Sequence, residues 1–155
     1  MLYVAYGSNC NIEQMAYMCP HSRRIGVGKL KGWKLVFNVH ADIIKTNNKN
    51  DVVSVVIWNI ADEDWHRLDM YEGFPSYYIK ENVNVILDCG IPVKAIVYVM
   101  AKNRKGICPP SQGYFDCIVH GVISNGIDVE CLYDALEYSF ENKTEYNQYK
   151  VKGMV

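Results

Sequence analysis

The sequence lacks several features that would mark whole classes of protein. No apolar run approaches the roughly 18 residues of a membrane-spanning helix, and no basic segment followed by an apolar run opens the chain. Neither sign of charge is in excess, because 16 Lys and Arg oppose 17 Asp and Glu, giving a formal net charge of -1. Such a balance predicts no surface for nucleic acid or anionic lipid. We therefore expect a cytoplasmic protein that binds neither nucleic acid nor membranes.

The cysteines and histidines lack the spacing of a disulfide framework or a metal site. The six cysteines are scattered and no Cys-x-x-Cys occurs. A chain of this length can bury a core without disulfides, so we interpret the cysteines as reduced thiols. The four histidines are also far apart. This spacing predicts no metal and no cofactor, although ligands that assemble only in three dimensions leave no such pattern.

The pattern of apolar residues predicts one domain over residues 1–140, followed by a polar tail at 141–155 to which we assign no structure. A polar run at 45–51 predicts a surface loop. Five segments have the β-branched or alternating composition of strands: 2–6, 24–39 (one or two strands with a turn near Lys31-Gly32), 52–60, 77–87 and 92–101.

Capping residues and helical spacing predict four helices. The first begins after Asn11 and runs to about Met18, and the second begins in the acidic run at 62–64 and ends at Gly73. The other two begin after Ser111 and Asp128 and run to about residues 125 and 139.

The first predicted strand runs directly into Gly7-Ser8-Asn9. Glycine has no Cβ, so a ligand can approach the backbone closely at Gly7, and successive N–H groups around Ser8 and Asn9 could form an anion-binding concavity. The same residues are typical of a tight turn in which Ser and Asn side chains bond to their own backbone. Without further information, the turn is the simpler interpretation.

Glu72 lies on the same helical stripe as Trp65 and Leu68, one residue before Gly73. A carboxylate is disfavoured at the C-terminus of a helix because it meets the negative end of the helix dipole. It either projects into solvent, as most glutamates do, or has a function. On the same helix, His66 and Asp69 are three residues apart and could form a surface hydrogen bond.

Three motifs in order carry a resemblance to a known family. They are the strand followed by YGSN at 6–9, the run LDxxEG at 68–73 followed by tyrosines and a strand, and PSxxYxxxIxxG at 110–121. With this spacing, the chain resembles the gamma-glutamylcyclotransferase-like family, also called avirulence-induced-gene-like, from Met1 to about Ala135. The resemblance implies an α+β fold: a small mixed β-barrel of about five to seven strands ringed by about four helices.

The resemblance also implies an activity and its residues. The family reaction releases an amine or amino acid from a gamma-glutamyl amide, because the substrate's own α-amino group attacks the γ-carbonyl and forms 5-oxoproline. Glu72 would be the catalytic acid/base, without a metal or a cofactor. Tyr6, Gly7, Ser8 and Asn9 would bind the small-molecule substrate, together with Tyr78. Tyr77 is adjacent and could take the place of Tyr78.

Other functions have weaker support in the sequence. A hydrolase using Ser8 or Cys10 as nucleophile would need a partnered base, and YGSNC lacks the Gly-x-Ser-x-Gly elbow. Ser111 and Tyr114 could reach the rim of a pocket, but a helix cap and core packing explain them. The alternative that stays open is a non-catalytic module that binds a small ligand on the same fold. The oligomeric state and the amine half of the substrate are not predicted.

Overall fold

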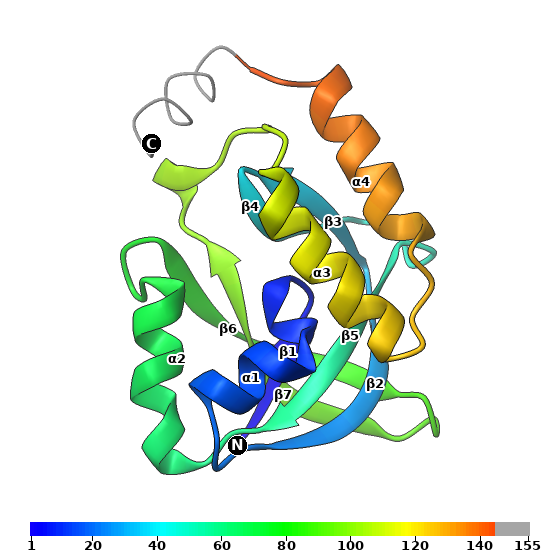
Figure 1. Cartoon of the computed structure of the whole chain (residues 1–155). Coiled ribbons are helices and arrows are strands. Elements are labelled where there is room, and N and C mark those ends of the chain that lie inside the picture. Colours follow the sequence, from blue (N-terminus) through cyan, green and yellow to red (C-terminus); the bar gives the residue numbers. More distant parts are fainter. Residues whose placement is uncertain (145–155) are drawn as a thin grey trace.

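The computed structural model describes residues 1–144, so residues 145–155 of the predicted tail lie outside the described residues. Seven strands and four α-helices follow one another in this part of the chain (Figure 1). The strands are β1 (Leu2–Ala5), β2 (Arg23–Lys31), β3 (Trp33–Asn38), β4 (His40–Lys45), β5 (Val52–Asn59), β6 (Tyr78–Leu87) and β7 (Pro92–Met100). The helices are α1 (Ile12–Met18), α2 (Trp65–Glu72), α3 (Gln112–Ser124) and α4 (Glu130–Glu141), with short 3-10 turns η1 (Ser8–Cys10), η2 (Asp62–Asp64) and η3 (Lys102–Arg104).

Five of the strands form a closed barrel in the order β1-β5-β2-β6-β7. Neighbouring strands are antiparallel except β1 and β7, which pair in parallel through Tyr3 with Ile96 and Val4 with Val97. The parallel pair closes the barrel. The expected mixed barrel with about four helices is therefore confirmed, although two of the seven strands lie outside the barrel.

The strand with the most continuous apolar sequence, β5, contributes fully buried residues to the core of the barrel. β5 pairs with β1 on one side and β2 on the other, and Val55, Val56 and Ile57 are fully buried. A strand covered on both faces has little reason to alternate apolar with polar residues. The prediction of a central strand at 52–60 is confirmed.

A glycine permits the barrel to close between β2 and β6. These strands pair only at Gly28 with Leu87 and at Lys29 with Ile86. A Cβ at Gly28 would lie 2.6 Å from the Ile86 carbonyl oxygen and 2.9 Å from Ile57 Cδ1. Any side chain at this position would force the two strands apart.

β3 and β4 form a separate two-stranded hairpin, and the sequence analysis did not predict β4 as a strand. Asn38 pairs with His40, so Val39 alone forms the apex, with a φ of 70°. A β-branched residue rarely adopts this left-handed conformation, and hairpin apices usually carry Gly, Asn or Asp. The sequence therefore contains no turn signal at this place. Hydrogen bonds to Cys108 fix the apex, since Val39 N donates to the Cys108 carbonyl oxygen.

The predicted helix starts are largely correct. The side chains of Asn11 and Ser111 accept hydrogen bonds from the N–H groups of Gln14 and Tyr114, as N-caps do. The start of α4 differs, because Val129 is the N-cap and Asp128 bonds to the N–H of Glu130 from one residue further out. In Figure 1, α2 flanks one side of the barrel, and α3 runs beside the N-terminal segment, where it contacts η1.

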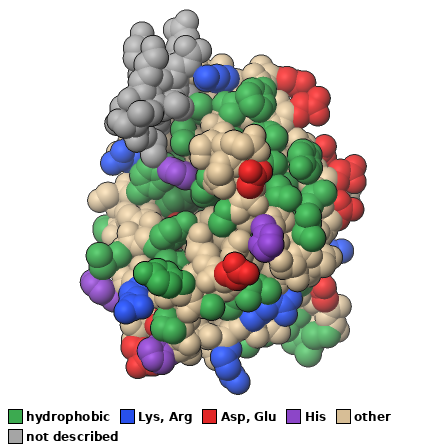
Figure 2. All heavy atoms as spheres, viewed as in Figure 1, with side chains coloured by type: hydrophobic (Ala, Val, Ile, Leu, Met, Phe, Trp, Pro, Cys, Tyr) green, Lys and Arg blue, Asp and Glu red, His purple; other side chains and the backbone are tan. Residues whose placement is uncertain are grey.

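The surface and the thiols agree with the composition. On the face in Figure 2, Lys and Arg side chains are scattered, and Asp and Glu side chains lie among them. All six cysteines are unpaired in the structure, and their interpretation as reduced thiols stays a prediction. Within residues 1–144, no helix is long and apolar enough to cross a membrane.

Candidate active site

The register of the barrel brings three distant parts of the chain to one end. β1 and β7 run in parallel, so the residues after β1 lie beside the C-terminal end of β7. β6 starts at the same end, where Tyr78 pairs with Met100. The YGSN turn and the segment that follows LDxxEG therefore meet at one mouth of the barrel. A cavity of about 390 Å³ opens there.

Half of the residues that line this cavity are tyrosines, and Glu72 is the one carboxylate among the described residues that line it. The lining comprises Tyr3, Tyr6, Gly7, Ser8, Asn9, His40, Ala41, Tyr71, Glu72, Gly73, Tyr77, Tyr78, Tyr98 and Tyr114. Every residue for which we predicted a site role lies on this lining. The structure thus brings them together, whereas their roles toward a substrate stay predictions.

The end of α2 directs Glu72 into the cavity. Gly73 ends the helix in the left-handed conformation, with a φ of 65°, and its N–H bonds to the Met70 carbonyl oxygen. The Glu72 carboxyl accepts a hydrogen bond from Asn9 Nδ2 at 3.0 Å, and the Tyr3 hydroxyl lies 3.5 Å from the same oxygen. No Lys or Arg within residues 1–144 pairs with it.

This environment changes the acidity of Glu72. Burial raises its pKa from 4.5 to about 8, and the hydrogen bond from Tyr3 offsets only part of that increase. A carboxyl group with a pKa near neutral pH can both accept and donate a proton under physiological conditions. Glu72 is therefore not a solvated carboxylate at the end of a helix.

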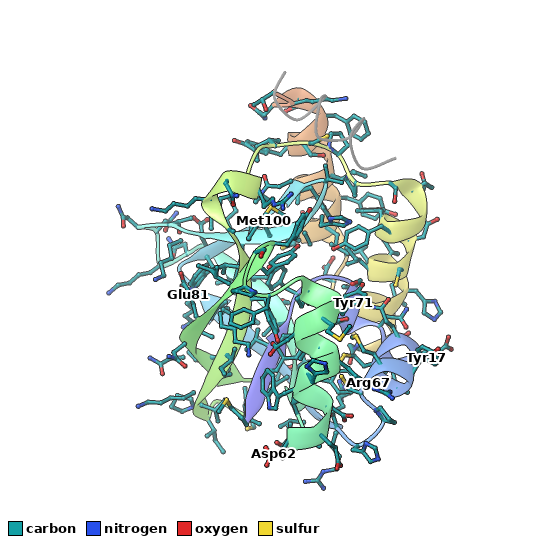
Figure 3. All side chains as sticks on the ribbon, turned by 90° about the vertical axis from the view of Figure 1, so that its left-hand side faces the viewer. Tyr17, Asp62, Arg67, Tyr71, Glu81 and Met100 are labelled. Atoms are coloured by element: carbon teal, nitrogen blue, oxygen red, sulfur yellow. The ribbon has the colours of Figure 1, made fainter. Side chains whose placement is uncertain are left out.

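The polar side chains of the YGSN turn do not bond to their own backbone, as they would in a simple turn. Ser8 Oγ forms a hydrogen bond with the Tyr71 hydroxyl at 2.7 Å, and Gln14 Nε2 donates to Ser8 Oγ and Asn9 Oδ1. Tyr71 lies at the end of α2 on the side that faces α1 (Figure 3). Gln14 on α1 thus fixes the turn against α2, and Asn9 Nδ2 remains available for Glu72.

The third motif supports the same turn from outside. A Cβ at Gly121, the last glycine of PSxxYxxxIxxG, would lie 2.5 Å from Asn11 N and 2.7 Å from the Cys10 carbonyl carbon. Asn125 Nδ2 donates to the Cys10 carbonyl oxygen at 2.9 Å. Helix α3 therefore packs directly on the backbone of η1, and only glycine permits this approach.

Most tyrosine hydroxyls around the cavity are held by the hairpin or the barrel. Tyr78 donates to the Ala41 carbonyl oxygen at 2.6 Å, and Tyr114 accepts from Ala41 N at 3.0 Å. Tyr6 donates to the Tyr98 carbonyl oxygen at 2.6 Å. Tyr78 therefore faces the cavity with its hydroxyl already bonded. Tyr77 also lines the cavity, so both tyrosines are placed to contact a substrate there.

Asp69 has a different partner from the one its spacing suggested. Its carboxylate pairs with Lys80 Nζ at 2.9 Å and accepts a hydrogen bond from the Tyr98 hydroxyl, whereas His66 forms no hydrogen bond with it. Lys80 also lies over the rings of Trp65 and Tyr98. The Asp of LDxxEG thus fixes the cavity wall at Tyr98.

Sequence reasoning missed several lining residues. Tyr3 lies on β1, the strand that leads into YGSN, and Tyr71 lies inside the LDxxEG run, so closeness to the motifs in the sequence could have indicated both. Tyr114 was explained by packing, but its hydroxyl holds Ala41 at the cavity wall. His40 had no signal, because β4 itself was not predicted.

Within residues 1–144, no group of three or more His, Cys, Asp or Glu side chains is placed to hold a metal ion. The acid of the site is a single carboxyl group among hydroxyls and amides. Such a set suits proton transfer and hydrogen bonding to a small polar ligand.

Comparisons with known proteins agree with this geometry. The family model for "Gamma-glutamyl cyclotransferase, AIG2-like" matches residues 3–116. A protein of Methanocaldococcus jannaschii named "Putative gamma-glutamylcyclotransferase MJ1514" is 29% identical over 97 residues, which are 62% of this chain and 79% of that protein. Since the family model covers most of the chain, the chain belongs to the gamma-glutamyl cyclotransferase, AIG2-like family.

Solved structures share the fold. A structure named "Gamma-glutamyl cyclotransferase" superposes with a TM-score of 0.72 and 24% identity and covers 98% of both chains. An uncharacterized protein from Homo sapiens gives a TM-score of 0.72 and 24% identity over 97% of both chains. YkqA from Bacillus subtilis gives 0.73 and 19% identity over 93% of this chain and 55% of YkqA. At these identities, the likeness concerns the fold alone.

Proposed function

We propose that this protein is a gamma-glutamylcyclotransferase, which cleaves a gamma-glutamyl amide into 5-oxoproline and a free amine, with Glu72 as the general acid/base. The observation that carries the proposal is the partly buried Glu72 carboxyl, whose pKa is raised to about 8 and which faces a cavity beside the YGSN turn. Membership of the family supports the same reaction.

The reaction needs few protein groups because both reacting centres belong to the substrate. The α-nitrogen attacks the γ-carbonyl carbon, a C–N bond forms, and the C–N bond to the amine half breaks. Ring closure within one bound molecule already supplies proximity, so the protein must hold the chain bent and move protons. A small cavity that encloses the glutamyl part would serve this purpose.

In this mechanism, Glu72 transfers protons from the attacking nitrogen to the departing nitrogen. The α-ammonium group of the substrate binds beside the carboxyl, and its positive charge favours the carboxylate form. Glu72 takes a proton from the ammonium group, which frees the lone pair for attack. It then returns a proton to the departing nitrogen as the amide bond breaks. Asn9, which donates to Glu72 Oε1, holds the carboxyl in place for both steps.

The YGSN turn provides donors for negative charge on the substrate. Within the described part of the chain, the backbone N–H groups of Ser8 and Asn9 have no hydrogen-bond acceptor. Gly7 adds no side chain in front of them, and a Cβ there would meet Ala41 Cβ at 3.1 Å. These N–H groups would bind the α-carboxylate or the oxyanion that forms at the γ-carbonyl.

The second candidate is a module that binds a gamma-glutamyl compound without turning it over. Within residues 1–144 the Glu72 carboxyl has no cationic partner, which favours catalysis, because such a group destabilises the fold above neutral pH. The experiment that separates the two candidates measures 5-oxoproline release from a panel of gamma-glutamyl amines and dipeptides, with calorimetric binding of the same compounds. Binding without 5-oxoproline would identify the binding module, and neither binding nor turnover would refute both.

A further inference from the structure

Glu72 is held at one of its two carboxyl oxygens. Asn9 Nδ2 donates to Oε1 at 3.0 Å, and the Tyr3 hydroxyl lies 3.5 Å from the same atom. Asn9 Nδ2 also donates to the Tyr3 hydroxyl at 3.0 Å, which leaves the proton of that hydroxyl to point at Glu72. In the described part of the chain, Oε2 forms no hydrogen bond. Oε1 is thus the fixed atom, and Oε2 is the atom left to exchange a proton with a ligand.

The direction of the Asn9 amide decides which charge state of Glu72 it favours. An N–H group that points at Oε1 stabilises the carboxylate, the form that can take a proton from the substrate ammonium group. If the amide were turned over, its Oδ1 would face Glu72 and would favour the protonated carboxyl instead. Asn9 is only 2% exposed, so protein groups and not bulk water determine which way its amide points.

Gln14 is the group that determines this direction. Its Nε2 donates to Asn9 Oδ1 at 2.8 Å, the shortest of the three hydrogen bonds of the Asn9 side chain. An Asn9 amide turned over would place Nδ2 against Gln14 Nε2, donor against donor. The other end of Gln14 is fixed too, because Cys117 Sγ donates to Gln14 Oε1 at 3.5 Å, and burial raises the pKa of this thiol so that it keeps its proton. The hydrogen bonds therefore run in one direction, from α3 through α1 and the YGSN turn to Glu72.

We propose that Gln14 is a positioning residue of the cyclotransferase reaction, which holds the Asn9 amide with its N–H group toward Glu72 and so keeps Glu72 in place as proton acceptor. The inference rests on the proposed function for its consequence in turnover, whereas the hydrogen bonds are a property of the free protein. Gln14 does not line the cavity, so its effect on a substrate passes through Asn9 and the turn.

The charge of Glu72 can be followed without interference from its neighbours. Within residues 1–144, the groups whose raised pKa includes a contribution from the Glu72 charge are tyrosines of β1, α2, β6, β7 and α3, or of the turn after β1: Tyr3, Tyr6, Tyr71, Tyr78, Tyr98 and Tyr114. Burial is the main cause of the raised pKa of each, so these hydroxyls stay neutral between about pH 5 and pH 9. His40 also lines the cavity, but burial lowers its pKa, so it loses its proton at a more acidic pH. A transition near pH 8 therefore belongs to Glu72.

The first test is the titration of Glu72 in the free protein, followed by the NMR signal of its carboxyl carbon in protein labelled with carbon-13 at glutamate. Gln14→Met keeps the length of the side chain, changes no charge and removes the donor to Asn9. The midpoint should move up by about 0.5–1 pH unit, because the Asn9 amide can then turn over and no longer favours the carboxylate. Gln14→Lys keeps a donor for Asn9 Oδ1 and should leave the midpoint at or below that of the wild type. Gln112→Met, which removes an exposed hydrogen bond to Asp116 on α3, is the matched control and should not move it.

The second test is turnover of a gamma-glutamyl compound. Gln14→Met should lower kcat by about 5- to 30-fold and change KM by less than about threefold, because a misplaced Glu72 impairs proton transfer more than binding. Asn9→Ala should lower kcat at least as much. Adding Gln14→Met to Asn9→Ala should change kcat by less than about twofold, because the contact through which Gln14 acts is already lost. Gln14→Lys should restore kcat to within about fivefold of the wild type, a rescue that a role in packing alone does not predict.

The outcomes are distinct. A Glu72 midpoint that Gln14→Met does not move, or losses in kcat from Gln14→Met and Asn9→Ala that simply multiply, would overturn the inference and leave the cyclotransferase proposal intact. Should the wild type form no 5-oxoproline, the proposed function fails, and the titration alone then decides whether Gln14 sets the Asn9 amide. A midpoint raised in Gln14→Met but not in Gln14→Lys supports that role, and equal midpoints overturn it. The same titration decides the matter where Asn9→Ala does not fold.

Discussion

Replacing Glu72 by Gln should change how the stability of the protein depends on pH. In the folded state the pKa of Glu72 is about 8, whereas an unfolded chain has the ordinary value of 4.5. Between these pH values the folded state keeps the proton that the unfolded state releases, so the free energy of unfolding of the wild type falls as the pH rises. The full shift corresponds to at most about 5 kcal/mol at about 1.4 kcal/mol per pH unit. The cavity admits water, so we expect about 1–3 kcal/mol to be observed.

Glutamine has the shape of glutamate, can accept the hydrogen bond from Asn9, and does not ionise. Urea unfolding of Glu72→Gln should therefore give a free energy within about 1 kcal/mol of wild type at pH 5 and about 1–3 kcal/mol above wild type at pH 9. Glu137→Gln, with an exposed side chain on α4, is the matched control and should show no such pH-dependent difference. If the Glu72 and Glu137 variants behaved alike from pH 5 to pH 9, Glu72 would be a solvated carboxylate and the argument from burial would be wrong.

Three further predictions follow from the site. Gly121→Ala places a Cβ against the η1 backbone and should lower the free energy of unfolding, measured in urea, by about 1–3 kcal/mol. Gly113→Ala on the same helix, with open space around its Cβ, should be neutral or slightly stabilising. Equal effects of the two substitutions would refute the close packing of α3. Gly7→Val should leave a folded protein, as judged by circular dichroism. Its KM should rise about tenfold or more, because the side chain presses on the cavity wall at Ala41. Unchanged kinetics would place the substrate elsewhere. The kcat/KM should rise about tenfold per pH unit up to about pH 8, because the substrate ammonium group binds the Glu72 carboxylate, and a flat pH profile would contradict the mechanism. Activity should survive exhaustive chelation, and a loss of activity that added metal restores would also contradict the mechanism.

Much of this architecture could be predicted because local chemistry specifies it. The β-branched run at 52–60 forms β5, Asn11 and Ser111 cap their helices, and Gly73 ends α2 as glycine does elsewhere. The motif residues met at one mouth of the barrel, as the family resemblance implied. For the strand and the helix ends, the signal lay within a few residues of the feature.

The features that could not be predicted depend on contacts between distant segments. β4 was missed because Val39 forms its turn, and that conformation is held by hydrogen bonds with Cys108, which is distant in the sequence. The raised pKa of Glu72 arises from burial beside tyrosines of five different strands and helices, which no local pattern reports. Asp69 on α2 pairs with Lys80 on β6, and not with His66 one turn away on the same helix.

The most direct test of the central claim is the rate at which Glu72→Gln forms 5-oxoproline from a gamma-glutamyl compound that the wild type turns over. Glutamine keeps the size and one hydrogen-bond acceptor of glutamate but cannot take the ammonium proton, so kcat should fall by about 10²- to 10⁴-fold while substrate binding weakens much less. A Glu72→Gln protein that releases 5-oxoproline at the rate of the wild type would contradict the assignment of Glu72 as the acid/base.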